Sequence, residues 1–233
     1  MPDFAVLISA DFEWQAILEI LHPSELLTSP LGDYFYHQLG KHSLLFYNSG
    51  WGKTRSAAAT QLVIERWKPR LIINTGTCGG LEGFAEVGEI LLITKTTIYD
   101  LIERMSDYQE ALDYYSAELQ TAWIGPNLPC NTRRAAIASA DQDIDFKNHN
   151  LLTETFKVPA ADWESAPIAW VAQKNETPCL ILRGVSDIVK ATSSESDNNL
   201  SLWQDRTRTI MQKIIADLPF YLEKFTSLNQ KTG

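Results

Sequence analysis

The feature that most constrains the fold is a short, fully apolar run that is followed at once by a helical pattern. Phe4 to Ser9 is rich in strand-forming residues, and Asp11 to Leu21 then places apolar residues at a helical spacing of about 3.6. Leu71 to Asn74 and Cys179 to Arg183 are further apolar runs of this kind. Strands that are apolar on both faces and alternate with helices form sheets covered on both sides. We therefore predict an α/β fold of three layers, α/β/α, around a central mixed, largely parallel sheet.

The other elements follow from the same patterns. Further strands are predicted at Glu89 to Thr94, at Ala135 to Ser139, and at His37 to Asn48, which holds one or two of them. Further helices are predicted at Thr54 to Trp67, Trp163 to Lys174 and Ser201 to Phe225. Turns are predicted at Ser49 to Lys53 and at the Gly-rich segment Thr75 to Gly80. Loops are expected where periodicity is lacking, at Tyr99 to Asn131 and at the Ser-rich Val189 to Asn199.

Size and composition fit one globular unit. The chain has 233 residues, of which 45% are apolar and 21% are charged, and a chain of this length can bury a core without metals or crosslinks. We expect a single domain over residues 1–233. The 20 basic and 29 acidic residues give a net charge of −9, whereas nucleic-acid binding needs clustered Lys and Arg against the phosphates. Nucleic acid is therefore not an expected partner.

The cysteines, histidines and apolar segments bear on the cellular compartment, on metal sites and on membrane segments. Cys78, Cys130 and Cys179 are far apart and form no Cys-x-x-Cys pair, so neither a disulfide framework nor a zinc site is predicted. The histidines show no metal-ligand spacing. No apolar stretch reaches the roughly 20 residues that cross a bilayer. We expect a cytoplasmic protein with no membrane segment, no metal and no organic cofactor.

Four segments with reactive side chains each follow a predicted strand. They are Asp11 to Trp14, Asn74 to Gly80, Ala161 to Ser165 and Arg183 to Asp187. The carboxyl ends of parallel strands meet at one edge of a sheet, where ligands bind in α/β proteins. We therefore expect these segments to form one pocket.

Taken one at a time, the candidate side chains leave more than one interpretation open. Glu13 lies in the first turn of a helix, where the helix dipole alone favours an acid. Glu164 fits a solvent-facing acid as well as a carboxylate that accepts from two sugar hydroxyls. Asp187 fits a helix cap as well as a buried carboxyl that delivers a proton. Cys78 lies in the Gly-rich segment without a His partner, and a small buried thiol is favoured over a nucleophile.

Several motifs occur in an order that resembles a known family. The motifs are SADFEW (Ser9 to Trp14), SGWGK (Ser49 to Lys53), KPRLIINTGTCGGL (Lys68 to Leu81), VGEILL (Val87 to Leu92), ADWESA (Ala161 to Ala166) and LRGVSD (Leu182 to Asp187). Together they resemble the nucleoside phosphorylase and nucleosidase superfamily, and most closely its 5′-methylthioadenosine/S-adenosylhomocysteine nucleosidase branch. The resemblance covers the chain from about residue 4 to about residue 225.

The resemblance implies a purine nucleosidase that hydrolyses the N-glycosidic bond. It implies that Glu13 activates water, that Asp187 protonates the purine at N7 and that Glu164 binds the ribose hydroxyls. Residues that help to hold the base, the water or the sugar are matched by Thr77, Arg183 and Ser186. The other positions expected to line the substrate site are Cys78, Gly79, Asp143, Ile144, Asp162 and Trp163.

Some positions depart from the family pattern. Asp143 stands where the bacterial nucleosidases stack an aromatic side chain on the base, so adenine and hypoxanthine both stay open as the base. Trp163 takes the place of a methionine beside the ribose and Ala10 replaces another, which would reshape the sugar pocket. The segment Tyr99 to Asn131, which in relatives often reaches across a dimer interface to line the 5′ pocket, is not recognisable, so the 5′ substituent stays open as well. Because family members pair, we expect a homodimer that binds a small-molecule purine nucleoside.

The group that attacks the sugar distinguishes hydrolysis from phosphorolysis. Phosphate carries about two negative charges and needs cationic donors. In the related phosphorylases an arginine occupies the place of Asn74, and here the first turn carries Asp11 and Glu13, which repel phosphate. We therefore favour hydrolysis, although Lys53 or Arg55 can reach an anion from the second turn. The alternatives are a phosphate-dependent purine nucleoside phosphorylase, a futalosine hydrolase, and a catalytically silent nucleoside-binding or storage relative.

Overall fold

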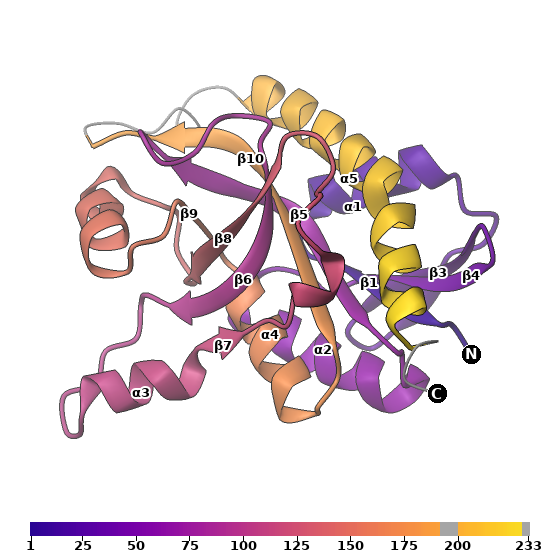
Figure 1. Ribbon diagram of the computed structural model, residues 1–233, viewed down its shortest axis with the longest axis horizontal. Coiled ribbons are helices and arrows are strands. Elements are labelled where there is room, and N and C mark those ends of the chain that lie inside the picture. The colour runs from indigo at the N-terminus through magenta and orange to yellow at the C-terminus, as the bar shows by residue number, and fades with distance from the viewer. Residues whose placement is uncertain (192–199, 230–233) are drawn as a thin grey trace.

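The computed structural model describes residues 1–191 and 200–229 (Figure 1). Its strands are β1 (Phe4–Ile8), β2 (Leu27–Ser29), β3 (Gly32–Leu39), β4 (His42–Asn48), β5 (Ile72–Leu81), β6 (Ile90–Ile98), β7 (Ala117–Glu118), β8 (Thr132–Ser139), β9 (Ala160–Asp162) and β10 (Cys179–Val189). Its helices are α1 (Asp11–Leu21), α2 (Gly52–Trp67), α3 (Tyr108–Tyr115), α4 (Ser165–Lys174) and α5 (Leu200–Asn229). Short helical turns are η1 (Ala122–Ile124), η2 (Phe146–Asn148) and η3 (Leu151–Thr155).

The described strands form one ten-stranded sheet. β1 lies between β4 and β5 and is parallel to both, and β10 is parallel to β5. β10 also pairs with β6 in antiparallel orientation, and β6 continues through β8 and β9 back to β5, so these strands close into a ring. β2, β3 and β4 extend the other edge in antiparallel orientation. The predicted mixed sheet is confirmed, and antiparallel pairs take a larger share of it than expected.

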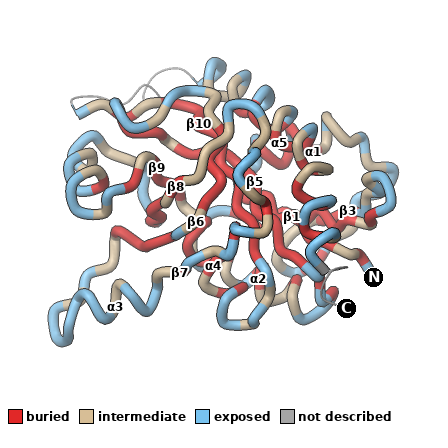
Figure 2. The backbone as a smooth tube through the Cα atoms, viewed as in Figure 1, coloured by how far each residue is buried: buried red, intermediate tan, exposed pale blue. Residues whose placement is uncertain are grey.

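Alternate side chains of the strands supply two cores, one on each face of the sheet. Phe4, Val6 and Ile8 of β1 pack with residues of α1 and α5, whereas Ala5 and Leu7 pack with residues of α2 and α4. All of these side chains are fully buried, and burial of a large apolar side chain stabilises a fold by about 1.5–3 kcal/mol. Figure 1 shows α1 beside α5 on one side of the strands and α2 beside α4 on the other, and Figure 2 shows the buried strands between them. The three-layer α/β/α architecture is therefore confirmed.

The helix after β1 begins and ends for identifiable reasons. α1 begins at Asp11 because the backbone N–H of Ala10 donates to the carboxylate of Glu13 at 3.2 Å. It ends before His22, whose left-handed backbone (φ 44°) lets its N–H donate to the carbonyl of Leu18. The carboxylate of Glu13 therefore turns back toward the carboxyl end of β1.

β5 and β10, which carry several of the predicted site residues, are longer than the sequence predicts. The prediction of a turn at Thr75 to Gly80 is wrong, because this segment lies within β5, which continues to Leu81. A strand fits there since Gly76 and Gly80 leave room for side chains of β10 that a Cβ would strike. β10 likewise continues to Val189, so Asp187 lies in a strand and is not a helix cap.

The segments without clear periodicity also hold structure. Tyr99 to Asn131 contains α3, β7 and η1. α3 has no buried residue, which explains its weak pattern, since helical periodicity comes from a buried apolar face. Of the second segment, Val189 ends β10, and residues 192–199 lie outside the described residues. In the part of the chain that the structure describes, no helix is long and apolar enough to cross a membrane.

Candidate active site

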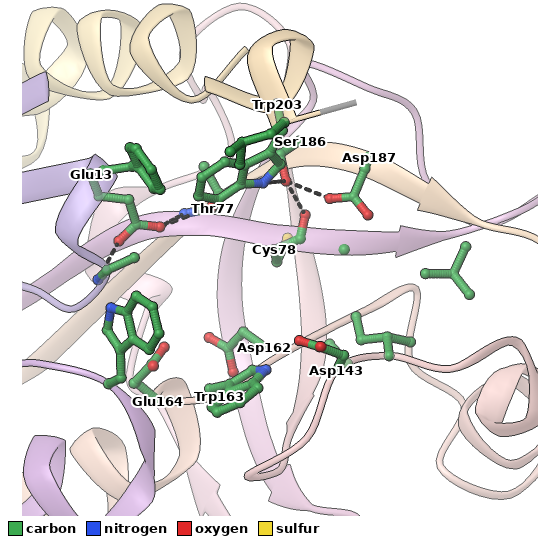
Figure 3. A pocket seen from close by; sticks show the side chains of 18 residues that line it. Glu13, Thr77, Cys78, Asp143, Asp162, Trp163, Glu164, Ser186, Asp187 and Trp203 are labelled. Atoms are coloured by element: carbon green, nitrogen blue, oxygen red, sulfur yellow. Dashed lines mark hydrogen bonds between the residues drawn. The ribbon is translucent and has the colours of Figure 1, made fainter. Parts of the chain in front are cut away.

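One cavity of about 660 Å³ opens at the carboxyl ends of β1, β4, β8 and β9, beside the later residues of β5 and β10 (Figure 3). All four segments that were expected to meet contribute to its wall. The predicted site residues that line it are Glu13, Thr77, Cys78, Gly79, Asp143, Ile144, Asp162, Trp163, Glu164, Ser186 and Asp187. Arg183 is not among the lining residues. A cavity of this size suits a small organic ligand.

Glu13 is fixed deep in the cavity by β5. The residue is 2% exposed. Its Oε1 accepts hydrogen bonds from the backbone N–H and the hydroxyl of Thr77 at 2.6 and 2.9 Å, and its Oε2 accepts from the N–H of Ala10. Gly76 makes this approach possible, because a Cβ there would lie 2.7 Å from both carboxylate oxygens. Glu13 therefore caps α1 and at the same time presents a buried carboxylate to the cavity.

Glu164 is the second buried glutamate of the cavity. Its Oε1 accepts from the backbone N–H of Gly52 at 3.0 Å, and its Oε2 lies 3.9 Å from Nη2 of Arg183. Burial raises the pKa of Glu164 to about 8, and the charge of Arg183 opposes this rise. The solvent-facing alternative is excluded, because the residue is only 8% exposed.

Arg183 lies behind the cavity wall as a buried cation. It is 1% exposed, its Nε lies 2.8 Å from Oδ2 of Asp162, and its Nη2 donates to Oδ1 of Asn74 at 2.7 Å. Burial opposes its charge, but the carboxylates of Asp162, Glu13 and Glu164 outweigh burial and raise the pKa of the guanidinium. Breaking a buried ion pair by removing one partner costs about 3–5 kcal/mol. From behind the cavity wall, the positive charge of Arg183 therefore offsets the negative charges of the acidic side chains.

Asp162 lines the cavity, but both of its carboxylate oxygens already bind side chains of the protein. Oδ1 accepts from the hydroxyl of Ser139 at 2.5 Å, and Oδ2 accepts from the hydroxyl of Ser165 and pairs with Arg183. Asp162 thus joins β8, the start of α4 and β10. Although the cavity wall is rich in acids, no group of three or more His, Cys, Asp or Glu side chains in residues 1–191 and 200–229 is arranged to hold a metal ion.

A β-bulge in β10 brings two consecutive side chains to the cavity. β10 pairs with β5 through Val185 and Cys78 and resumes at Asp187 and Gly79, so Ser186 is the extra residue. In a regular strand, neighbouring side chains point to opposite faces, whereas here Ser186 and Asp187 both line the cavity. The hydroxyl of Ser186 contacts Oδ1 of Asp187 at 2.7 Å.

Cys78 and Asp143 are also among the predicted residues that line the cavity. Burial raises the pKa of the Cys78 thiol well above its ordinary value, and the nearby Asp162 adds to the rise, so the thiol stays protonated and is no nucleophile. Figure 3 shows Asp143 and Asp187 toward one end of the cavity and Glu13 and Glu164 toward the other.

Several lining residues were not predicted as part of the site. They are Trp51, Val189, Leu200 and Trp203. Ala10, which was expected in the sugar pocket, and Phe12 and Ala161, which lie in the segments expected to form the pocket, also line it. The sequence could have indicated Trp51 as a site residue, because Trp51 follows a predicted strand and lies between two glycines in a turn. It gives no such indication for Trp203, since Trp203 lies in α5, more than ten residues beyond the last site motif. The turn after β4 also differs from expectation, because Lys53 and Arg55 do not line the cavity.

A family model described as the phosphorylase superfamily matches residues 19–216. The chain belongs to the phosphorylase superfamily. One relative in this superfamily is the 5′-methylthioadenosine/S-adenosylhomocysteine nucleosidase of Oceanobacillus iheyensis, which is 30% identical over 178 residues, 71% of this chain and 77% of that protein.

Solved structures of other proteins share the fold of this chain. The 5′-methylthioadenosine/S-adenosylhomocysteine nucleosidase from Neisseria meningitidis, in complex with methylthio-immucillin-A, has a TM-score of 0.78 at 20% identity and covers 95% of this chain and 100% of that one. Futalosine hydrolase of Helicobacter pylori has a TM-score of 0.78 at 18% identity, with 92% and 95% covered. The nucleoside phosphorylase-like fold that the motifs implied is therefore confirmed. In our chain, the residues that the family model matches include Thr77, Glu164 and Asp187, and Glu13 lies just before the matched range.

Proposed function

We propose that this protein is a nucleosidase that hydrolyses the N-glycosidic bond of a 5′-substituted purine nucleoside, of the 5′-methylthioadenosine/S-adenosylhomocysteine type. The observation that carries the proposal is the meeting of Glu13, Glu164 and Asp187, which are far apart in the sequence, in one cavity. The name of the Oceanobacillus iheyensis relative supports the same reaction.

Cleavage of this bond needs help at the base and at the sugar. A purine anion is a poor leaving group, and the ribosyl carbon becomes positively charged in the transition state. Protonation at N7 lets the base leave as a neutral molecule that keeps the electron pair of the broken C–N bond. A carboxylate near the sugar stabilises the developing charge. Each positioned acid or base contributes about 10²- to 10⁴-fold to the rate.

In the proposed reaction, Asp187 donates its proton to N7 while Glu13 accepts a proton from the attacking water. A C–O bond replaces the C–N bond, Asp187 ends as a carboxylate and Glu13 as an acid, and solvent returns both to their starting states. The hydrogen bonds from Thr77 to Oε1 of Glu13, at 2.6 and 2.9 Å, support the role of the base by fixing its orientation.

Glu164 would accept hydrogen bonds from the two ribose hydroxyls. The N–H of Gly52 fixes its orientation at 3.0 Å. The pKa of about 8 supports this role, because hydroxyls that donate to the carboxyl group favour its charged form and so oppose the effect of burial. Trp163 would flank the sugar. Residues proposed to surround the base are Cys78, Gly79, Asp143, Ile144 and Ser186.

The cations near the cavity support attack by water over attack by phosphate. The ammonium group of Lys53 is held by both carboxylate oxygens of Asp100 at 2.5 and 2.6 Å, and Nε of Arg55 donates to the carbonyl of Leu31. Arg183 is engaged by Asp162. None of the described lining residues is Lys or Arg. A cavity of this charge repels phosphate.

A futalosine hydrolase is the second candidate. Phe12, Trp51 and Trp203 line the cavity and give it an aromatic wall that suits a larger, flat 5′ substituent. The equal TM-scores of 0.78 for the two nucleosidase types leave the fold neutral between them.

Base release from a panel of nucleosides tests the proposal. The purified protein is incubated with methylthioadenosine, adenosylhomocysteine, futalosine, adenosine and inosine, with and without inorganic phosphate. We expect free base and a free ribosyl sugar in phosphate-free buffer. Formation of ribose 1-phosphate would support a phosphorylase instead, and binding without any base release would support a silent relative.

We also propose that the enzyme is a homodimer of single-domain chains that works in the cytoplasm. Ile102 and Met105, which precede α3, are 74% and 99% exposed, and a subunit interface would remove such apolar side chains from water. Three free cysteines suit a reducing compartment. Light scattering on the purified protein tests the dimer, with the mass of a monomer as the contrary result.

A further inference from the structure

We propose that Trp203 is a positioning residue for Asp187 that acts through Ser186. The inference rests on the proposed function, because it assigns a role within that reaction. Trp203 lies near the start of α5, half-buried in the cavity wall, and Figure 3 shows its indole next to Ser186.

Two hydrogen bonds connect Trp203 to Asp187. The indole N–H donates to Oγ of Ser186 at 3.2 Å, and Oγ lies 2.7 Å from Oδ1 of Asp187. An indole N–H can only donate, and a hydroxyl carries one proton, so Oγ accepts from Trp203 and keeps its own proton for another acceptor. The carbonyl of Cys78 is the competing acceptor, but at 3.3 Å it is farther away than Oδ1. Ser186 therefore donates to Asp187.

This arrangement sets the orientation of the Asp187 carboxyl, because Oδ1 accepts from Ser186. Oδ2 faces Gly79, since a Cβ at Gly79 would lie 3.7 Å from it. The same Cβ would lie 2.5 Å from Cδ1 of Ile144, and both of these residues line the cavity. Oδ2 is thus turned toward the wall that is proposed to surround the base.

Trp203 also contacts the helix that carries the proposed base. Its ring meets the ring of Phe12 edge to face, with centroids 5.4 Å apart at 85°. Phe12 directly precedes Glu13 in the first turn of α1. One indole therefore contacts the sequence neighbours of both Glu13 and Asp187.

The test measures kcat and KM on the best substrate of the nucleoside panel for the wild type, Trp203→Phe, Ser186→Ala and the double variant. Trp203→Phe keeps an aromatic ring and removes the donor. We expect kcat to fall by about 3- to 10-fold, the loss typical of one neutral hydrogen bond, with KM changed by less than about 2-fold. In the Ser186→Ala background, Trp203→Phe should lower kcat no further, because the two residues act in series.

Trp67→Phe is the matched control. Trp67 also donates its indole N–H to a hydroxyl, that of Tyr36 at 2.8 Å, outside the cavity. We expect its kcat to equal that of the wild type. Trp203→Leu, which also lacks the donor, gives a second variant if Trp203→Phe does not fold.

The outcomes separate the two proposals. An active wild type with an unchanged kcat in Trp203→Phe, or losses that multiply in the double variant, contradicts the role of Trp203 alone. A rise in KM without a fall in kcat shows that the ring only packs on the substrate and also overturns the role. A wild type that cleaves no nucleoside of the panel contradicts the proposed function, and the role of Trp203 falls with it.

Discussion

The stability of the Glu164→Gln variant, compared with that of the wild type, should increase as the pH rises. The variant keeps the size of the side chain and its acceptor for the N–H of Gly52, but it removes a carboxyl whose pKa burial raises to about 8. A folded-state pKa above the ordinary value of 4.5 means that the native state binds the proton more tightly than the unfolded chain does. The resulting stability is fully present below about pH 4.5 and is lost as the pH rises through about 8.

The size of the effect follows from the same values. The difference between a pKa of about 8 and 4.5 corresponds to about 5 kcal/mol in all. Between about pH 6 and about pH 8, the wild type should lose about 2 kcal/mol relative to Glu164→Gln. For a protein of this length, that difference shifts Tm by roughly 4–8 °C.

Urea unfolding at several pH values measures this difference. The matched control is Glu118→Gln, which makes the same change in charge at an exposed position of β7, and its pH dependence is subtracted. A stability gap between the wild type and Glu164→Gln that stays constant between about pH 6 and about pH 8 would refute the reasoning. We also expect Glu164→Gln to raise KM, because an amide is a weaker acceptor for ribose hydroxyls.

Three further predictions concern Glu13, Gly76 and Lys53. Glu13→Gln should lower kcat by at least about 100-fold with little change in nucleoside affinity, measured by steady-state kinetics and calorimetry; an active variant would contradict its role as the base. Gly76→Ala places a Cβ 2.3 Å from Nη1 of Arg183, so we expect a lower Tm and a kcat reduced by about 100-fold, and wild-type kinetics would show that the close approach is unimportant. Lys53→Ala should leave kcat within about 2-fold of the wild type, because Asp100 already engages the ammonium group; a large loss would indicate that Lys53 reaches the substrate.

The sequence predicts the layers of this fold because its strands have a simple pattern. The run at Phe4–Ile8 is apolar at every position, and a strand of that kind must be covered on both faces. The boundaries of α1 were also predictable, since Asp11 to Leu21 has a clear apolar face. The extension of β5 through its glycines was not, because glycines are typical of turns, and here their reason is the side chains of another strand.

The site is only partly predictable for a related reason. Glu13 and Asp187 follow named predicted strands, and strand ends meet in an α/β sheet. The short strand before Glu164, β9, was not among the strands predicted by range. The bulge at Ser186 depends on the pairing with β5 and leaves no mark in the local sequence. The position of Arg183 behind the wall, and the contact of Trp203 with Ser186, depend on which elements pack together, so local patterns do not predict them.

Base release by the wild type and by Asp187→Asn in phosphate-free buffer tests the central claim most directly. Asparagine keeps the shape of the side chain but cannot transfer a proton to the base. We predict that the wild type releases free base and that Asp187→Asn does so at least about 100-fold more slowly while it still binds the nucleoside. Turnover by Asp187→Asn at the wild-type rate, or no base release by the wild type, would contradict the account.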